Sequence, residues 1–467
     1  MRWGQKSDSR NTAATLRRQA TDPVTGLLNY AAFLNECSAA LTAFVGDGSP
    51  ARPSVLLVDL DGVTAAVEGE DDSAADEVIR LTAGRIEREV GSLGMVARSS
   101  DRQVGVLFPH LPDPAVALDM AYRIVAAISS PLALTSGRRV QISASCGLAL
   151  REVVSAGAGA IDLLRASGLA VREARRGGRN RIEVCTPEVI ASADETLVIG
   201  KDLRQALQEK ALRVYYQPLV KLSDGVIVGF EALVRWNHPV HGEVPPSRFV
   251  MIAEQVGLIS ELGRTVLSTA SAQVQEWSST FGIPLDIHVN VSSADLTEDS
   301  FVTTVRESVA ASGLAPTHLV LEVTEGAVKP ELDIARVRFD ALHELTVRIA
   351  LDDFTTGRST LGYLESLRVD ILKVDRFHLD SPDNQKDSYP PGPDMLRDAI
   401  GVGRSLGMKV YGEGIENEEE RERLRHEGCE IGQGYLFARP LPAEEATALL
   451  REQVALTLAG KSAPTVR

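Results

Sequence analysis

Strand-like and helix-like stretches alternate along the first 186 residues. Runs of apolar and β-branched residues lie at 54–62, 96–108 and 140–150, and the segments between them have the apolar spacing of amphipathic helices. This pattern predicts an α/β or α+β sheet domain over residues 20–186. A polar stretch, 187–197, is expected to link this domain to a second one.

Residues 198–450 contain eight strand-like runs, the first at 213–219, and helix-length stretches separate most of them. Their number and spacing predict a TIM-like (β/α)8 barrel, a fold that typically takes about 250 residues. The first two runs are separated by little more than the turn from Ser223 to Gly225. Because a parallel crossover needs about a dozen residues or more, we expect this pair to be antiparallel and the barrel to contain one reversed strand.

Seven of the strand-like runs in the second domain end on acidic or amide residues. They are Glu231, Asn290, Glu322, Asp352 with Asp353, Asp375, Glu413 and Gln433. Barrel strands that end in this way place their side chains at one mouth, where barrel enzymes keep their active sites. So many oxygen ligands would repel one another unless hard divalent cations neutralised them. The pattern therefore predicts a metal site.

Composition narrows the class of protein. A chain of 467 residues with 44% hydrophobic content fits two well-packed domains. The net charge of −15 argues against a nucleic-acid partner. No apolar run is long enough to span a membrane, and we expect a soluble, cytoplasmic protein. The cysteines are far apart and fit buried thiols in a reducing compartment rather than a zinc site; they are Cys37, Cys146, Cys185 and Cys429.

A series of motifs in a fixed order covers nearly all of the second domain. They are EALVRWNHPVHGEVPPSRFVMIAEQVGLI, VNVS, LEVTE, DDFTTGRSTL, LKVDRF, YGEGIENEEE and GQGYLFARPL. This series resembles the EAL-domain family of cyclic di-GMP phosphodiesterases. The EAL tripeptide alone would carry no weight, but so many motifs in the right order make chance agreement negligible.

The resemblance implies that the acidic strand ends hold two divalent cations. Glu231, Asn290, Glu322 and Asp352 would hold one, and Asp352, Asp353 and Glu413 the other. Two cations suit phosphodiester hydrolysis because they supply an attacking hydroxide and neutralise the phosphoryl group. An all-oxygen shell favours Mg²⁺ or Mn²⁺ over Zn²⁺. We interpret four histidines as surface or core residues rather than ligands: His238, His241, His288 and His343.

The resemblance also implies roles around the metals. Lys373 would orient or deprotonate the attacking water and would form the catalytic group with Glu231 and Glu413. The substrate-binding residues would be Gln217, Arg235, Asp375 and Gln433, the last reaching a metal-bound water. Glu325 and Glu416 would support loops. The ligand is expected to be cyclic di-GMP.

One loop departs from the family pattern. The family usually has DDFGTGYSSL, whereas this chain has DDFTTGRSTL, with Thr355 for a glycine and Arg358 for a tyrosine. A β-branched threonine resists the backbone angles that a glycine supports. In the family this loop links metal binding to the dimer surface, so the change bears on catalytic rate and its regulation.

The first domain resembles the GGDEF, or diguanylate cyclase, family through LRRQATDPVTGLLNYAAF, SVLLVDLDG and ARRGGRNRIEV. In a gapless register the GGDEF motif itself falls on residues 100–104, which read SDRQV. Arg102 and Gln103 cannot replace the carboxylates that a cyclase needs for Mg²⁺, although Asp59 and Asp76 survive. We therefore expect a degenerate domain that regulates or dimerises and does not make cyclic di-GMP.

Two hypotheses for the whole chain remain open. The first is a metal-dependent phosphodiesterase that converts cyclic di-GMP to 5′-pGpG, working as a homodimer and able to contact a protein partner through the GGDEF-like domain. The second is a non-catalytic receptor that binds cyclic di-GMP and signals through altered contacts. The complete ligand set favours the enzyme, and the altered loop favours the receptor.

Overall fold

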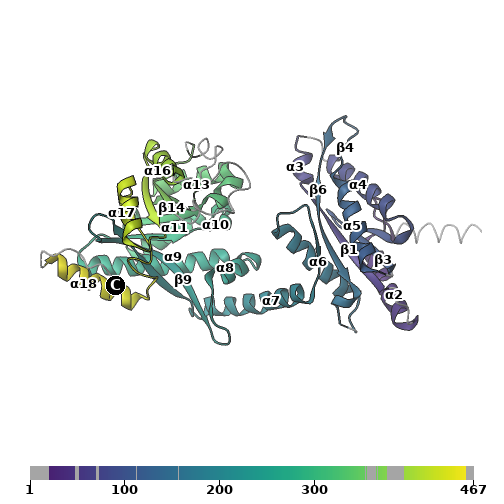
Figure 1. The fold of residues 1–467 in the computed structure, drawn as a ribbon, viewed down its shortest axis with the longest axis horizontal. Helices are drawn as coiled ribbons and strands as arrows, with labels where there is room; N and C mark the ends of the chain where they lie inside the picture. Colours follow the sequence, from purple (N-terminus) through teal and green to yellow (C-terminus); the bar gives the residue numbers. More distant parts are fainter. Residues whose placement is uncertain are drawn as a thin grey trace, which may run out of the picture. The chain divides into compact units, whose positions relative to one another are not determined.

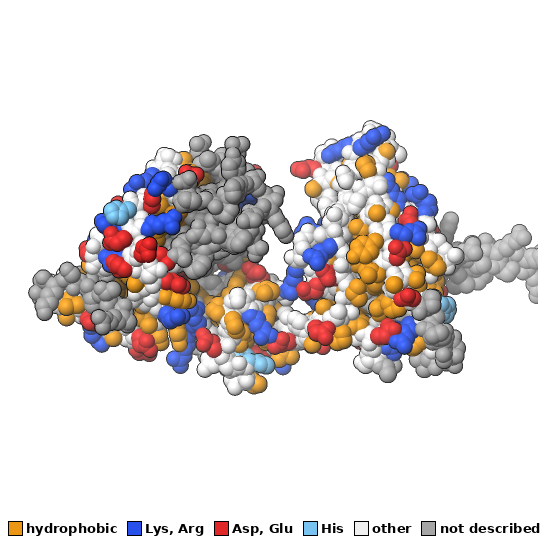
Figure 2. All heavy atoms as spheres, viewed as in Figure 1, with side chains coloured by type: hydrophobic (Ala, Val, Ile, Leu, Met, Phe, Trp, Pro, Cys, Tyr) orange, Lys and Arg blue, Asp and Glu red, His pale blue; other side chains and the backbone are white. Residues whose placement is uncertain are grey.

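The computed structural model describes residues 20–458 except 48–51, 70–72, 112, 156, 353, 355–363, 365 and 376–393. The chain divides into two compact units between Leu197 and Val198 (Figure 1). Acidic and basic side chains are interspersed on the described surface of the face drawn in Figure 2. In the described part of the chain, no helix combines the length and apolar composition that crossing a bilayer requires.

The first unit is built on a five-stranded sheet in the order β2-β3-β1-β6-β7. The central strand β1 (Arg52–Asp61) pairs antiparallel with β3 and β6 and is buried along almost its whole length. Helices α4 and α5 pack on one face of the sheet and α2 and α6 on the other, so β1 contributes to two separate cores (Figure 1). The other bounds are α2 Tyr30–Asp47, α3 Val63–Ala66, α4 Ala74–Val90, η1 Gly91–Leu93, β2 Met95–Ser100, β3 Gln103–Leu111, α5 Pro114–Ser129, β4 Leu132–Ala133, β5 Arg139–Val140, β6 Ser143–Leu150, η2 Arg151–Val153, α6 Ala160–Arg176 and β7 Ile182–Val184.

The predicted single strand at 96–108 is wrong. This segment forms two antiparallel strands, β2 and β3, joined by a tight turn at Asp101 and Arg102. The physical reason is that the polar residues at its centre cannot be buried in a continuous strand and instead form an exposed turn. The turn is tied to the sheet, because the carbonyl of Arg102 accepts a hydrogen bond from the amide of Leu60 at 2.9 Å.

The second unit contains a closed eight-stranded barrel in the order β8-β9-β11-β12-β13-β14-β15-β16, with β16 pairing back to β8. Strand β8 (Arg213–Lys221) is antiparallel to both of its neighbours, and the other barrel strands are parallel. The predicted TIM-like barrel with one reversed strand is therefore confirmed. The other bounds are β9 Ile227–His238, β10 Gly242–Val244, α8 Pro246–Gln255, α9 Ile259–Phe281, β11 Asp286–Asn290, α10 Ser293–Thr297, α11 Phe301–Ser312, η3 Pro316–His318, β12 Leu319–Thr324, α12 Glu325–Val328, η4 Lys329–Glu331, α13 Leu332–Glu344, β13 Arg348–Asp352, β14 Ile371–Asp375, α16 Asp394–Ser405, β15 Lys409–Glu413, α17 Glu418–Glu427, β16 Ile431–Gly432 and α18 Ala443–Leu458.

The inside of the barrel is filled by an apolar layer below its mouth. This layer is a separate buried cluster of Leu219, Val320, Ala350, Ile371 and Tyr411. Because strand side chains alternate between faces, the residue two positions further along each parallel strand also points inward and lies nearer the mouth. Those residues are Glu322, Asp352, Lys373 and Glu413. The alternation thus places a polar layer directly on an apolar one.

The segment 187–197, predicted to link the two domains, belongs to one continuous helix, α7 (Pro187–Gln208). Its second half contributes Ile199, Leu203 and Leu207 to the core of the barrel unit. Its first half packs Val189 against the core of the first unit. The domain limits predicted from the sequence, 20–186 and 198–450, stay predictions, but α7 has a packed role in both units.

Candidate active site

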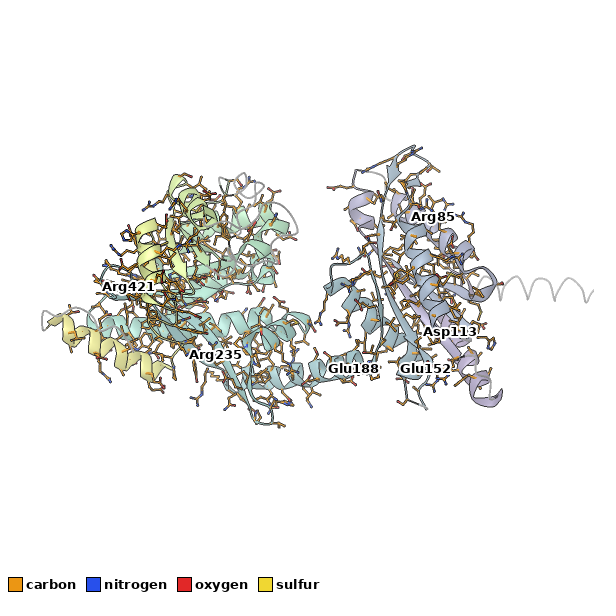
Figure 3. The ribbon with its side chains drawn as sticks, viewed as in Figure 1. Arg85, Asp113, Glu152, Glu188, Arg235 and Arg421 are labelled. Carbon is orange, nitrogen blue, oxygen red and sulfur yellow. The ribbon has the colours of Figure 1, made fainter. Side chains whose placement is uncertain are left out.

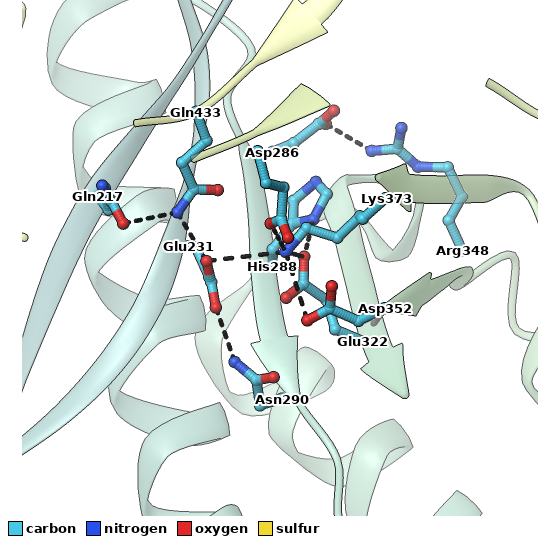
Figure 4. Close-up of polar contacts among 11 residues, drawn as sticks. Gln217, Glu231, Asp286, His288, Asn290, Glu322, Arg348, Asp352, Lys373 and Gln433 are labelled. Atoms are coloured by element: carbon cyan, nitrogen blue, oxygen red, sulfur yellow. Dashed lines mark hydrogen bonds and ion pairs between the residues drawn. The ribbon is translucent and has the colours of Figure 1, made fainter. Parts of the chain in front are cut away.

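Four carboxylates surround one buried lysine at the mouth of the barrel. Figure 4 shows Lys373 with Glu231, Glu322 and Asp352. The Nζ atom of Lys373 lies 2.5 Å from Glu413 Oε1 and 2.8 Å from Glu322 Oε1. It also lies 3.7 Å from Glu231 Oε2 and 3.8 Å from Asp352 Oδ2. Lys373 is only 1% exposed, so these charges interact with little screening by water. Five strands therefore bring their charged side chains to one point, with Glu231 inside β9 rather than at its end.

The charges of this cluster are unbalanced. Burial alone would lower the pKa of Lys373, but the four carboxylates around it hold that pKa well above its usual range. Burial raises the pKa of Glu322 and of Glu413 well above the ordinary value, and neighbouring carboxylates add to the rise. One ammonium thus does not compensate four carboxylates, of which Glu231 and Glu322 are buried and Asp352 and Glu413 are partly buried. The cluster has the electrostatics of a site that needs further positive charge.

A series of side-chain amides orients Glu231 through hydrogen bonds. Asn290 Nδ2 donates to Glu231 Oε1 at 2.8 Å, and Gln433 Nε2 donates to Glu231 Oε2 at 2.7 Å. The same Gln433 nitrogen donates to Gln217 Oε1 at 2.8 Å, and Gln217 Nε2 donates to the carbonyl of Ala438 at 3.2 Å. Each amide is oriented by its hydrogen-bond partners in this series. The orientation leaves Gln433 Oε1 buried and without a hydrogen-bond partner among the described residues.

His288, interpreted from the sequence as a surface or core residue, is a core residue that lies beside this site. The side chain is fully buried, and its Nδ1 lies 2.6 Å from Glu322 Oε1. Burial, reinforced by Lys373, lowers the pKa of His288 to about 3, so the imidazole is neutral. A signal was available in the sequence: His288 precedes Asn290 by two residues and therefore lies on the same face of β11.

The donor set fits a hard divalent cation. Glu322 Oε2 and Gln433 Oε1 are buried oxygens without hydrogen-bond partners among the described residues. Carboxylate and amide oxygens are the ligands of Mg²⁺, Mn²⁺ and Ca²⁺ rather than of Zn²⁺. No three acidic, histidine or cysteine side chains of the described residues already stand in a ligating arrangement, and the Lys373 ammonium lies among the carboxylates. Asp353 lies outside the described residues.

The other predicted residues are distributed around this cluster. Arg235 lies further along β9 (Figure 3), where its guanidinium stands 5.6 Å from the centre of the Tyr215 ring. Arg235 and Asn290 both line a cavity of about 460 Å³. Asp375 ends β14 and pairs with Glu413 of β15 in the sheet register, but its side chain is not described.

The two residues predicted to support loops differ in their surroundings. Glu325 is buried at the start of α12, and its Oε1 lies 4.0 Å from Lys329 Nζ. Glu416 has an exposed side chain, and its backbone amide donates to Glu420 Oε2 at 2.8 Å. Thr355 and Arg358 of the altered loop lie outside the described residues.

A barrel with one reversed strand and an acidic mouth around a lysine defines a class of protein. Residues 201–440 match the model of the EAL domain, and residues 19–181 match the model of the diguanylate cyclase, GGDEF domain. The chain belongs to the EAL-domain family and has a GGDEF-family domain that precedes the barrel in the sequence.

Two relatives from Pseudomonas aeruginosa share this organisation over most of the chain. The bifunctional diguanylate cyclase/cyclic di-GMP phosphodiesterase MucR is 34% identical over 85% of this chain and 57% of its own length. The cyclic di-GMP phosphodiesterase NbdA is 33% identical over 94% of this chain and 55% of its own length. The chain therefore spans a little over half the length of these relatives.

Solved structures agree with the fold. The EAL enzyme Bd1971 in its cAMP- and cyclic-di-GMP-bound form is 26% identical, with a TM-score of 0.51 over 67% of this chain and 82% of that one. The S helix-GGDEF-EAL part of LapD from Vibrio cholerae has a TM-score of 0.59 over 92% of this chain and 99% of that one. At 16% identity, the likeness to LapD concerns the fold alone.

Proposed function

We propose that this protein hydrolyses cyclic di-GMP to linear 5′-pGpG at the mouth of its EAL barrel, with two divalent cations, Mg²⁺ or Mn²⁺, as cofactors. The observation that carries the proposal is the cluster of four carboxylates around the buried Lys373. Within it, oxygens of Glu322 and Gln433 are left without partners among the described residues. The activities for which MucR and NbdA are named support the choice of substrate.

The strand-end residues divide between the two cations. Glu231, Asn290, Glu322 and Asp352 would hold one, and Asp352, Asp353 and Glu413 the other. When bound, the cations would neutralise the phosphoryl oxygens and make hydroxide available near neutral pH. The chain of Gln217, Gln433 and Asn290 keeps Glu231 in place by hydrogen bonds to both of its carboxylate oxygens.

The protein's own side chains position the reacting groups. The attacking water oxygen forms a bond to phosphorus, the bond from phosphorus to the 3′-oxygen breaks, and the 3′-oxygen leaves with a proton. The ammonium of Lys373 would donate to the water and fix its direction of attack, with Glu413 beside it. Arg235, on the cavity of about 460 Å³ next to Asn290, would neutralise the phosphate, and Asp375 would contact the same end of the substrate.

The direct test is incubation of the purified full chain with cyclic di-GMP and either Mg²⁺ or Mn²⁺, followed by chromatography. Linear 5′-pGpG that forms only with the metal supports the proposal. The second candidate function, a non-catalytic receptor, rests on the altered loop with Thr355 and Arg358. Binding of cyclic di-GMP with no linear product in either metal would favour the receptor.

We further propose that the first unit is a degenerate GGDEF domain that regulates the barrel or contributes to a homodimer. The position of the GGDEF motif is the β2–β3 turn, where Arg102 and Gln103 replace the acidic pair. The surviving Asp59 is buried and forms an ion pair with Arg175 of α6. The guanidinium of Arg175, from the same unit, thus neutralises the carboxylate that a cyclase needs for its cation.

A further inference from the structure

The two carboxylate oxygens of Glu322 have different surroundings. Oε1 lies 2.8 Å from Lys373 Nζ and 2.6 Å from His288 Nδ1. Oε2 is equally buried but has no hydrogen-bond partner among the described residues. One oxygen is therefore contacted by an ammonium and an imidazole of the protein, while the other has no such contact.

The position of His288 is fixed by the barrel interior. It lies on β11, pairs in register with Val320 of β12, and is completely buried. Its ring centre is 5.7 Å from that of Tyr411 in the apolar layer below. The ammonium of Lys373 lies 2.8 Å from Glu322 Oε1 and has no lone pair, so this oxygen faces it as a negatively charged acceptor. We therefore assign His288 as a donor to the same oxygen through Nδ1–H. The other ring nitrogen, Nε2, has no hydrogen-bond partner among the described residues.

We propose that His288 is a positioning residue that, together with Lys373, pins Oε1 of Glu322 and reserves Oε2 for a divalent cation. The inference rests on the metal-dependent function proposed above. A carboxylate held at one oxygen by two donors has lost the freedom to rotate, so it meets a cation in a single orientation. Hydrogen bonds that orient metal ligands in this way strengthen metal binding. The role requires the donor of His288 and not merely a ring that fills the space.

Two substitutions distinguish the effect of the N–H donor of His288 from the effect of its aromatic ring. His288→Asn keeps an N–H donor close to the position of Nδ1, whereas His288→Phe keeps an aromatic ring beside Tyr411 and has no donor. His238→Phe is the matched control: His238 is also buried and lies 3.0 Å from a carboxylate, that of Asp202, away from the acidic cluster. If His288→Phe does not fold, His288→Leu replaces it.

The measurement is the affinity of each full-chain variant for Mn²⁺, by calorimetry without substrate, alongside its metal-free melting temperature. We expect His288→Phe to bind Mn²⁺ about 10–100-fold more weakly than the unsubstituted protein. His288→Asn and His238→Phe should bind nearly as well as the unsubstituted protein. Turnover by His288→Phe should be low at limiting Mn²⁺ and should recover as Mn²⁺ is raised.

The outcomes separate this inference from the proposed function. Unchanged Mn²⁺ affinity in a folded His288→Phe variant would overturn the inference and leave the function standing. Equal losses in the Asn and Phe variants would also overturn it, because the ring and not the donor would then matter. If the unsubstituted protein bound no divalent cation, the metal-dependent function itself would fail, and the inference with it.

Discussion

Glu231 is contacted by two side-chain amides and by the buried lysine at the mouth. It accepts hydrogen bonds from Asn290 and Gln433 and faces Lys373. We expect Glu231→Ala to abolish hydrolysis of cyclic di-GMP, because the change removes a cation ligand and deprives both amides of their acceptor. The assay is formation of 5′-pGpG, with Glu243→Ala on the exposed strand β10 as the control. Hydrolysis at the normal rate by Glu231→Ala would rule out the proposed site.

Lys373 compensates part of the buried negative charge when no metal is bound. Removing one member of a buried ion cluster typically costs about 3–5 kcal/mol, so we expect Lys373→Met to lower the metal-free stability clearly. Its melting temperature should rise more on adding Mn²⁺ than that of the unsubstituted protein, because cations then supply the missing charge. Turnover should be largely lost, with binding of cyclic di-GMP nearly kept. A metal-free melting temperature equal to that of the unsubstituted protein would contradict this view of the cluster.

At the scale of the elements, an ion pair ties helix α13 to the start of β14, the strand that carries Lys373. His343 Nε2 donates to Asp370 Oδ2 at 2.9 Å, and His343 Nδ1 donates to the carbonyl of Phe339 at 2.8 Å. Asp370 Oδ2 also accepts from the amide of Ile349 at 2.8 Å. Both nitrogens of His343 donate, so the imidazolium is the form that the folded barrel prefers.

This ion pair makes part of the barrel's stability depend on pH. The hydrogen bond to Asp370 raises the pKa of His343 above its ordinary 6.5, although burial opposes the rise. The stabilisation is therefore complete below about pH 6.5 and is lost as the pH rises through the folded-state pKa. We expect His343→Gln to lower the melting temperature more at about pH 6 than at about pH 8.5. Equal losses at both pH values would contradict the prediction, and the exposed His110→Gln serves as the control.

The sequence predicts the barrel strands well because two independent signals coincide. Each run has the length and the β-branched residues of a strand, and most end on a polar residue at the mouth. The two-residue alternation then places Glu322, Asp352 and Lys373 on the inner face. The bond from His288 to Glu322 is harder to predict, because it depends on the register between β11 and β12. The β2–β3 hairpin is harder to predict because the turn at Asp101 and Arg102 interrupts two apolar runs that are close enough in sequence to look like one strand.

At the scale of the whole molecule, the packing of helix α7 determines where the chain can be truncated without loss of the barrel fold. Deleting residues 1–186 keeps Ile199, Leu203 and Leu207, which the barrel core needs, so we expect a folded barrel. Deleting residues 1–208 removes them and should give an unstable protein. Circular dichroism and thermal melting of the two truncated proteins check this expectation. Equal stability of both would show that α7 does not support the barrel.

Deletion of residues 1–186 also tests the role of the first unit. If the first unit regulates the barrel or joins it in a dimer, deleting residues 1–186 should change the hydrolysis rate several-fold or change the oligomeric state. The full chain should produce no cyclic di-GMP from GTP with Mg²⁺ or Mn²⁺, because Arg175 neutralises Asp59 and residues 102 and 103 are not acidic. Identical kinetics and oligomeric state with and without the first unit would leave it without the proposed role.

The pairing of β8 with β16 has a consequence for how the protein is synthesised. The second neighbour of the first barrel strand, β8, is β16, which contains Ile431 and Gly432. Tyr216 of β8 also pairs with Leu441, which lies still later in the sequence. A chain emerging from the ribosome can complete its first unit early, but its barrel stays open until β16 has been made. Gln433, the amide that holds Glu231, arrives with the same late segment. A chain that stops short of β16 therefore lacks the closed barrel as well as the complete site.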